Sequence, residues 1–209
     1  MLKRIDRRFK AALKPRFNLA ALEREPASVI GLWPDSRVAY VNKAWIAFAE
    51  KNSGNPTISE HWGIGSRYLD AIAEPLQPFY QRLFERALEA NDSLHPISHQ
   101  YECSSAKLFR EFNMQVYSLA DQQGFVIVNS LVVERPQDPT ERPAHVGDAT
   151  HYLRPNGTML QCAHCRRMQS AENPARWDWV PEWVEQSPPN TSHGICEVCA
   201  AYYYADEQY

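Results

Sequence analysis

The chain has 209 residues, of which 44% are apolar and 22% are charged, and its formal net charge at pH 7 is -3. This balance is typical of a globular protein with a real core and argues against a disordered chain. The longest nearly continuous apolar run, 124–133, is about half the roughly 20 residues that a membrane-spanning helix needs, so we expect no membrane span.

The amino-terminal segment, residues 1–24, is expected to form an amphipathic helix or arm. Residues 1–16 hold seven Lys or Arg against one Asp, whereas the rest of the chain is acidic. The apolar residues before Pro15 recur every three or four positions, as on one helix face: Leu2, Ile5, Phe9 and Leu13. Such a helix can cap a sheet or join a second subunit, and binding of nucleic acid is the weaker interpretation of its charge. The segment lacks the apolar stretch of a secretory signal, so we expect a cytoplasmic protein.

Residues 25–134 are predicted to form one folded domain. Turn-forming residues divide the segment 29–41 into a hairpin, and Asn42 is placed to cap a short helix that follows. A longer amphipathic helix is predicted over 79–90. From 97 to 133 apolar and polar residues alternate, which indicates three antiparallel strands. This order predicts an α+β fold, a five-stranded antiparallel sheet with helices on one face.

The element order resembles that of the PAS domains. The resemblance rests on "RVAYVNKAWIAFAEKN", in which a strand runs into an Asn and a helix with Trp and Phe, and on "YECSS" followed by "FREFNMQVYSLADQQGFVIVNSLV". It implies a sensing or interaction module, often dimeric, whose sheet and helices enclose a pocket for a small molecule. A filled core that serves only protein contact is the alternative, because fold alone does not determine function.

Candidate residues for such a pocket are few: His95, His99 and Asn129. The two histidines follow the long helix and lie near an expected pocket wall, where either could serve as an axial ligand of haem. A lone His is more often hydrogen-bonded or exposed, so haem binding is a minor alternative.

Two Cys-x-x-Cys pairs, "CAHC" and "CEVC", lie near the carboxyl end. Four thiolates arranged in two such pairs can surround one ion, and Zn²⁺ is the metal most often held in this way. We therefore predict a zinc-ribbon-like module at 151–209, behind a proline-containing linker at 135–150. The metal in this module would be structural Zn²⁺, and its ligands would be Cys162, Cys165, Cys196 and Cys199.

Thirty residues separate the two pairs, more than the common spacing, so the intervening segment must form structure of its own. It contains enough large apolar side chains for a small core beside the metal: Trp177, Trp179, Val180, Trp183 and Val184. The two pairs with this Trp-rich middle also resemble a tail found behind some bacterial sensor and signalling domains. That resemblance implies the same four ligands and leaves the role of the tail open.

Other interpretations of the cysteines remain. The four could be buried or disulfide-paired without a metal, and His164 or His193 could replace one of them as a ligand. Arg166 and Arg167 could lower the pKa of Cys165, which would make the cluster a redox sensor that releases zinc on oxidation. A catalytic zinc is disfavoured, because four sulfur ligands leave no position for water.

Sequence motifs of catalysis are missing: the chain has no Gly-rich phosphate loop, no H-E-x-x-H and no G-x-S-x-G. We therefore expect a cytoplasmic sensory or adaptor protein that is not an enzyme, forms a homodimer and signals by protein–protein contact. The main alternative is a thiol-based redox sensor. A haem-binding or DNA-binding regulator is less favoured.

Overall fold

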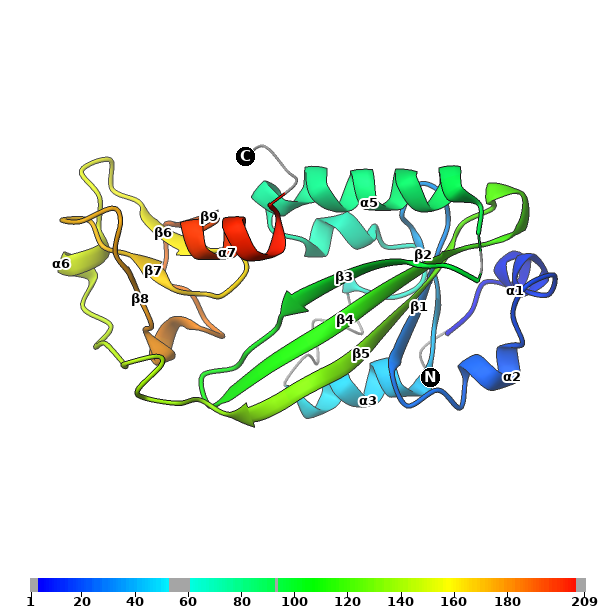
Figure 1. Ribbon diagram of the computed structural model, residues 1–209, viewed down its shortest axis with the longest axis horizontal. Coiled ribbons are helices and arrows are strands. Elements are labelled where there is room, and N and C mark those ends of the chain that lie inside the picture. Colours follow the sequence, from blue (N-terminus) through cyan, green and yellow to red (C-terminus); the bar gives the residue numbers. More distant parts are fainter. Residues whose placement is uncertain (1–3, 53–60, 93, 206–209) are drawn as a thin grey trace. The chain divides into compact units, whose positions relative to one another are not determined.

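The computed structural model describes residues 4–52, 61–92 and 94–205 (Figure 1). Packing divides the chain into two compact units, each assembled from several segments. The first unit comprises residues 1–72, 77–99 and 113–130, and the second comprises residues 73–76, 100–112 and 131–209. The domain boundaries predicted from the sequence stay predictions.

The larger sheet has five strands in the spatial order β2-β1-β5-β4-β3. In chain order they are β1 (Ser28–Leu32), β2 (Val38–Val41), β3 (Ile97–Glu102), β4 (Leu108–Ser118) and β5 (Phe125–Pro136). The pair β1–β2 is the predicted hairpin, and β1 also pairs antiparallel with β5, which joins the early and late parts of the chain. Each of β3, β4 and β5 contributes residues to both units. The predicted α+β class with a five-stranded antiparallel sheet is confirmed.

Short helices and one long helix accompany this sheet. They are α1 (Arg7–Leu13), α2 (Leu19–Leu22), α3 (Lys43–Lys51) and α5 (Gln77–Ala90), with 3-10 turns η1 (Tyr68–Ala71), η2 (Glu74–Leu76) and η3 (Ala120–Gln122). The helix predicted over 79–90 is α5, and Asn91 follows it with a φ of 45°, in the left-handed region that Asn tolerates. Among the described helices, none is both long and apolar enough to cross a bilayer.

Asn42 links the start of α3 to the sheet, as its predicted capping role requires. Its side-chain oxygen accepts hydrogen bonds from the backbone N–H of Trp45, at 2.9 Å, and of Val29, at 3.0 Å. Its amide nitrogen donates to three backbone carbonyls of the α2–β1 segment. The side chain is fully buried, so its hydrogen bonds replace those that water would otherwise make.

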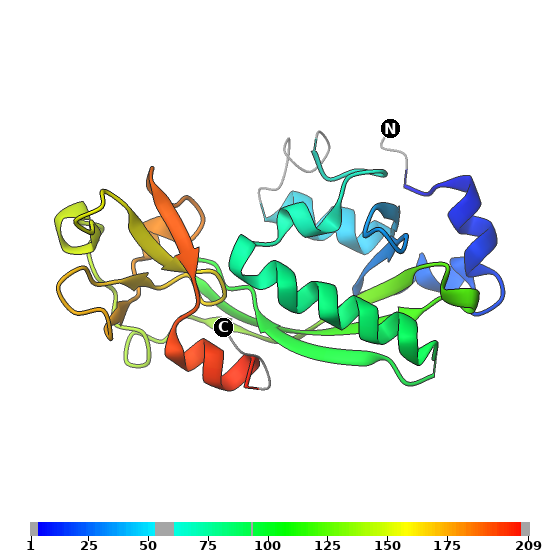
Figure 2. The same cartoon turned by 90° about the horizontal axis from the view of Figure 1, so that it is seen from above.

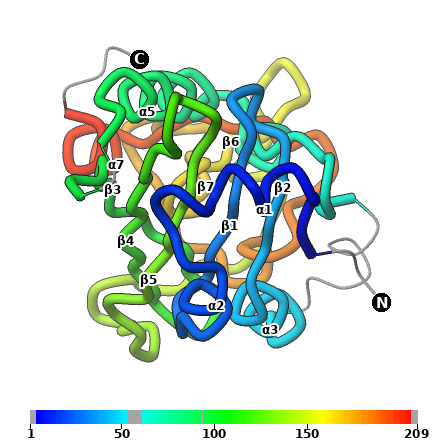
Figure 3. The backbone as a smooth tube through the Cα atoms, turned by 90° about the vertical axis from the view of Figure 1, so that its right-hand side faces the viewer, coloured from blue at the N-terminus to red at the C-terminus, as the bar shows by residue number. Residues whose placement is uncertain are grey.

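Helices cover both faces of the sheet in the first unit, not the single face that the sequence predicted. Neighbouring residues of a strand point to opposite faces, and Phe125 of β5 contacts Phe84 of α5, with ring centroids 5.3 Å apart. The next residue, Val126, packs instead in a core with Phe9 of α1. Figure 3 shows α1 lying across β1 and β2. The amino-terminal helix therefore caps the sheet, which is one of its two predicted roles. Of the predicted apolar stripe, Ile5 lies before the helix and pairs with Tyr40, and Leu2 lies outside the described residues.

A second, smaller sheet lies near the carboxyl end of the chain, in yellow to orange in Figure 2. It has four strands in the order β8-β7-β6-β9. Its elements are α6 (Ala149–Tyr152), β6 (Met159–Cys162), β7 (Met168–Gln169), β8 (Trp177–Asp178), η4 (Pro181–Trp183), β9 (Thr191–Gly194) and α7 (Glu197–Tyr203). Antiparallel pairs join β6 to β7 and β7 to β8, whereas β6 and β9 run parallel. This small module holds all four cysteines of the two Cys-x-x-Cys pairs.

Candidate metal centre

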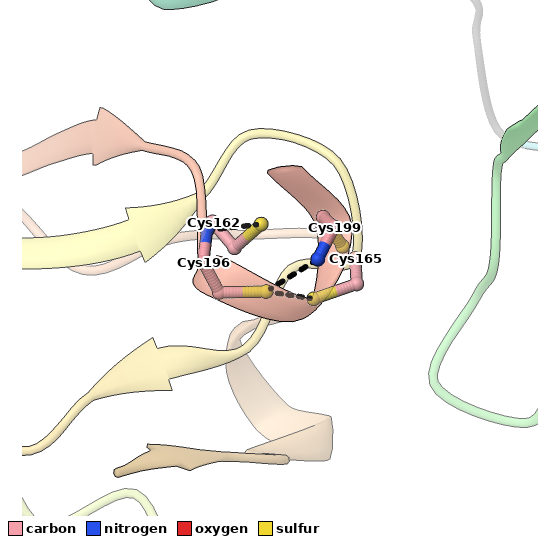
Figure 4. A group of neighbouring side chains, drawn as sticks. All are labelled: Cys162, Cys165, Cys196 and Cys199. Carbon is pink, nitrogen blue, oxygen red and sulfur yellow. Dashed lines mark hydrogen bonds between the residues drawn. The ribbon is translucent and has the colours of Figure 1, made fainter. Parts of the chain in front are cut away.

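The parallel pairing of β6 with β9 brings the two cysteine pairs together. Cys162 is the last residue of β6 and lies opposite Gly194 at the end of β9. Cys165 follows in the turn after β6, while Cys196 caps the amino end of α7 and Cys199 lies in its first turn. Two strand ends that point in the same direction therefore place both pairs at one edge of the small sheet (Figure 4).

The four sulfurs have the spacing of a tetrahedral metal site. Their Sγ atoms all lie within 4.8 Å of one another, and those of Cys165 and Cys196 are 3.8 Å apart. A tetrahedron with metal–sulfur bonds of about 2.3 Å has edges of about 3.8 Å, whereas a disulfide bond is about 2.05 Å long. All five cysteines of the chain are free thiols. The donor set and its spacing thus fit Zn²⁺ and argue against a disulfide pairing.

Burial and hydrogen bonding complete the site. All four cysteines are at most 3% exposed. The backbone N–H groups of Cys196 and Cys199 each donate to a sulfur of the cluster at 3.4 Å. Hydrogen bonding to Cys165 lowers the pKa of Cys162, whereas hydrogen bonding to Cys162 raises the pKa of Cys199. Opposite shifts are expected for thiols that share protons at contact distance, and a bound cation is what stabilises four thiolates together.

The two histidines considered as substitute ligands, His164 and His193, are not part of the group of potential metal ligands. His164 is buried, with Nε2 3.0 Å from the backbone nitrogen of Glu102 and Nδ1 2.8 Å from the hydroxyl of Tyr204. Both ring nitrogens therefore have partners other than the sulfur cluster. His193 lies on β9 opposite Gln161, and burial lowers its pKa. The cluster of potential ligands among the described residues contains cysteines alone.

The Trp-rich segment forms two apolar groups rather than one. Trp177 packs against the cysteines together with Ile195 and Tyr203. A separate core contains Val180, with Trp183 packed against it. Two other buried members of that core, Tyr152 and Met159, precede the segment between the cysteine pairs, and Met168 lies near its start. Of the apolar side chains predicted to lie beside the metal, Trp177 packs against the cysteines, whereas Val180 and Trp183 belong to the separate core.

The residues predicted to line a PAS-type pocket lie apart in the first unit. The side chain of His95 is 84% exposed, and its Nδ1 lies 2.8 Å from Oδ2 of Asp92. His99 is buried on β3 against the rings of Phe79 and Tyr80. Asn129 is buried on β5, and β4 separates that strand from β3.

A cavity of about 290 Å³ in the same unit has a lining that includes none of those three pocket candidates. It lies instead beside the turn between β1 and β2, and Leu69, Phe84 and Phe125 are among its lining residues. Ligand binding by the three predicted residues therefore stays a prediction.

A polar pocket of about 370 Å³ lies in the second unit, and no pattern in the sequence predicts it. Its lining includes Asp178, which accepts hydrogen bonds from Tyr152 at 3.2 Å and Arg176 at 2.8 Å and lies 3.5 Å from His145. Burial and the neighbouring Asp178 raise the pKa of Tyr152 to about 12. Because the carboxylate has protein partners on both oxygens, we interpret the group as a structural link between the predicted linker and β8.

Two solved structures show distant similarity to the chain. No model of a known protein family matches the chain, and no curated protein matches it. A domain of an HTR-like protein from Haloarcula marismortui matches with 12% identity and a TM-score of 0.34, over 52% of this chain and 100% of that one. The VqmA dimer of Vibrio cholerae, described in connection with DNA binding by LuxR-type receptors, matches with 14% identity and a TM-score of 0.32, over 66% of this chain and 62% of that one. Similarities at this distance assign the chain no family, ligand or partner.

Proposed function

We propose that the chain is a sensory or adaptor protein in which a PAS-like unit is joined to a module built around one structural zinc ion. The main support for the metal site is the group of four buried cysteines, whose sulfurs lie within 4.8 Å of one another. The PAS-like part is supported by the element order and the five-stranded antiparallel sheet, which match what the sequence resemblance implies.

Structural zinc accounts for how so small a module can fold. Its main core has four buried residues, which is little apolar area for a four-stranded sheet of two- and four-residue strands. Binding of structural zinc contributes on the order of 10 kcal/mol in small zinc domains. Four sulfur ligands also close the coordination sphere, so the ion would have no position for a reacting water. We therefore propose a protein that is not an enzyme.

We propose that the protein signals by contact with a partner protein and that it forms a homodimer. The inner face of α1 is buried on the sheet, while Arg7, Lys10 and Lys14 are exposed on its outer side. A partner with acidic side chains would complement this outer face, and an exposed seven-residue helix offers little for sequence-specific reading of DNA. A small molecule bound in the first unit stays part of the proposal as the input signal.

Burial favours a structural role for the sulfurs over a redox role. Redox-sensing cysteines are usually solvent-accessible thiolates, since the oxidant must reach the sulfur. The four sulfurs here belong to residues that are 0 to 3% exposed. We expect mild peroxide to leave the metal in place, and rapid release of zinc under peroxide would favour the redox alternative instead.

The metal content of freshly purified protein tests the proposal. We expect about one zinc per chain, lost in Cys162→Ser and retained in Cys103→Ser, because Cys103 lies outside the cluster. Less than about half an equivalent in the unmutated protein would contradict the zinc site. A cobalt-substituted sample should show a spectrum with four sulfur donors, and evidence of a coordinated water would instead support catalysis. A native mass spectrum of the same sample would report subunit number and any retained small molecule.

A further inference from the structure

The turn that carries the first cysteine pair also contacts the end of a strand of the larger sheet. His164, which stands between Cys162 and Cys165, is 5% exposed. Its Nε2 accepts a hydrogen bond from the backbone N–H of Glu102, so in the neutral ring Nδ1 carries the proton and donates to the Tyr204 hydroxyl.

Glu102 is the last residue of β3, and β3 is an edge strand of its sheet. The next N–H along the chain, that of Cys103, donates inward to the carbonyl of Arg110 at 3.0 Å. Successive N–H groups of a strand point in opposite directions, so the Glu102 N–H points outward from the sheet edge. Edge N–H groups need a partner or solvent, and here the imidazole supplies the partner.

The side chain of Glu102 is fixed as firmly as its backbone. Its carboxylate is 3% exposed and accepts two hydrogen bonds from the guanidinium of Arg142, at 2.6 and 2.7 Å. Ser104 donates a third, at 2.6 Å. The guanidinium lies over the rings of Phe109 and Trp179, 5.1 and 5.2 Å from their centroids. Glu102 is therefore held by the metal-site turn through its backbone and by a stacked arginine through its side chain.

We propose that occupancy of the cysteine cluster is transmitted to the end of β3 through His164, so that this strand end is ordered when the metal is bound and loosened when it leaves. The inference rests on the proposed function, because it requires the metal. With the ion bound, Cys162 and Cys165 would hold the turn from both sides of His164. In this turn Arg166 takes a left-handed φ of 65°. Without the ion, four crowded thiols can separate, and the imidazole loses its fixed position opposite the Glu102 N–H.

Thermodynamic linkage makes the effect reciprocal. If bound metal strengthens the contact between His164 and Glu102, that contact must strengthen metal binding by the same factor. Groups that orient the ligands of a metal typically change its affinity about 10- to 100-fold when they are removed. His164 is thus a positioning residue for the centre and, at the same time, the residue through which the strand senses it.

Amide hydrogen exchange and zinc competition on the full chain test this together. In the unmutated protein we expect peptide 100–112 to be protected with zinc and to exchange about tenfold faster after chelation. In His164→Leu the peptide should exchange fast even with zinc bound, and zinc affinity should fall about 10- to 100-fold. His164→Gln, which keeps a hydrogen-bond acceptor, should restore much of the protection. His193→Leu, on the neighbouring strand β9, should behave like the unmutated protein.

Distinct outcomes separate this inference from the proposed function. If zinc binds at about one equivalent but His164→Leu protects peptide 100–112 as well as the unmutated chain does, the coupling is wrong and the metal site stands. If the unmutated chain binds no zinc, both fail. If His164→Leu does not fold, Tyr204→Phe is the test, because it removes only the hydroxyl beside Nδ1 of His164. Unchanged hydrogen exchange of peptide 100–112 and unchanged zinc affinity in that variant would overturn the coupling.

Discussion

Replacing Arg142 by Met is expected to lower the free energy of unfolding of the protein by about 3–5 kcal/mol. The carboxylate of Glu102, 3% exposed, would stay buried but lose two hydrogen bonds of 2.6 and 2.7 Å, and a buried charge left without its partner costs about that much. Met keeps an apolar stem against the rings of Phe109 and Trp179, so most of the loss would come from the charge. For a chain of this length the change corresponds to a fall in Tm of roughly 6–20 °C.

Arg135→Met is the matched control. The Arg135 guanidinium also lies over Phe109, at 4.7 Å, and pairs with Glu141 at 2.6 Å, but these two side chains are 40% and 58% exposed. Exposed pairs contribute less than about 1 kcal/mol. Urea unfolding of the zinc-loaded proteins gives the comparison, and equal losses in both variants would refute the reasoning. Adding Glu102→Gln to Arg142→Met should recover part of the stability, because the unpaired charge is then removed.

Three further predictions concern the first unit. Gly124→Ala should lower the free energy of unfolding by about 1–3 kcal/mol, because the new Cβ would lie 2.2 Å from the carbonyl oxygen of Leu32 and Gly124 has a φ of 145°. Gly63→Ala, which has open space around the new Cβ, should be near neutral in the same urea titration. Asn42→Asp should cost about 3 kcal/mol in thermal unfolding at pH 7, since a buried carboxylate would replace the amide that donates to three carbonyls; an unchanged Tm would contradict this. Burial lowers the pKa of His99 to about 4 from its ordinary 6.5, so the unfolded chain takes up the proton first and stability should fall as pH drops below about 6.5, by about 2 kcal/mol at pH 5. His99→Leu should abolish this part of the pH dependence, and a slope that persists in the variant would assign it to other groups.

Local patterns in the sequence identified most elements of the larger sheet and the cysteine cluster, whereas the strands of the small sheet were not predicted. Alternation of apolar and polar residues predicts the late strands because a strand with one buried face requires it. Asn42 was recognisable as a cap because its side chain acts on residues close to it in sequence. The cysteines could be paired because each Cys-x-x-Cys unit supplies two donors on one turn.

Local patterns could not predict the features that depend on contacts between residues far apart in sequence. Glu102 and Arg142 are 40 residues apart, and no periodicity relates them. The apolar stripe of α1 indicates a buried helix face, but only the packing of Phe9 against the sheet shows what covers it. Likewise, the spacing of the cysteines does not specify that β6 and β9 run parallel, although this pairing is what brings the two cysteine pairs to one edge.

X-ray absorption at the zinc edge, recorded on the freshly purified full chain, tests the central claim most directly. The account predicts four sulfur neighbours at about 2.3 Å from a single kind of zinc site. Nitrogen or oxygen neighbours at about 2.0–2.1 Å, or a sample without bound zinc, would contradict it.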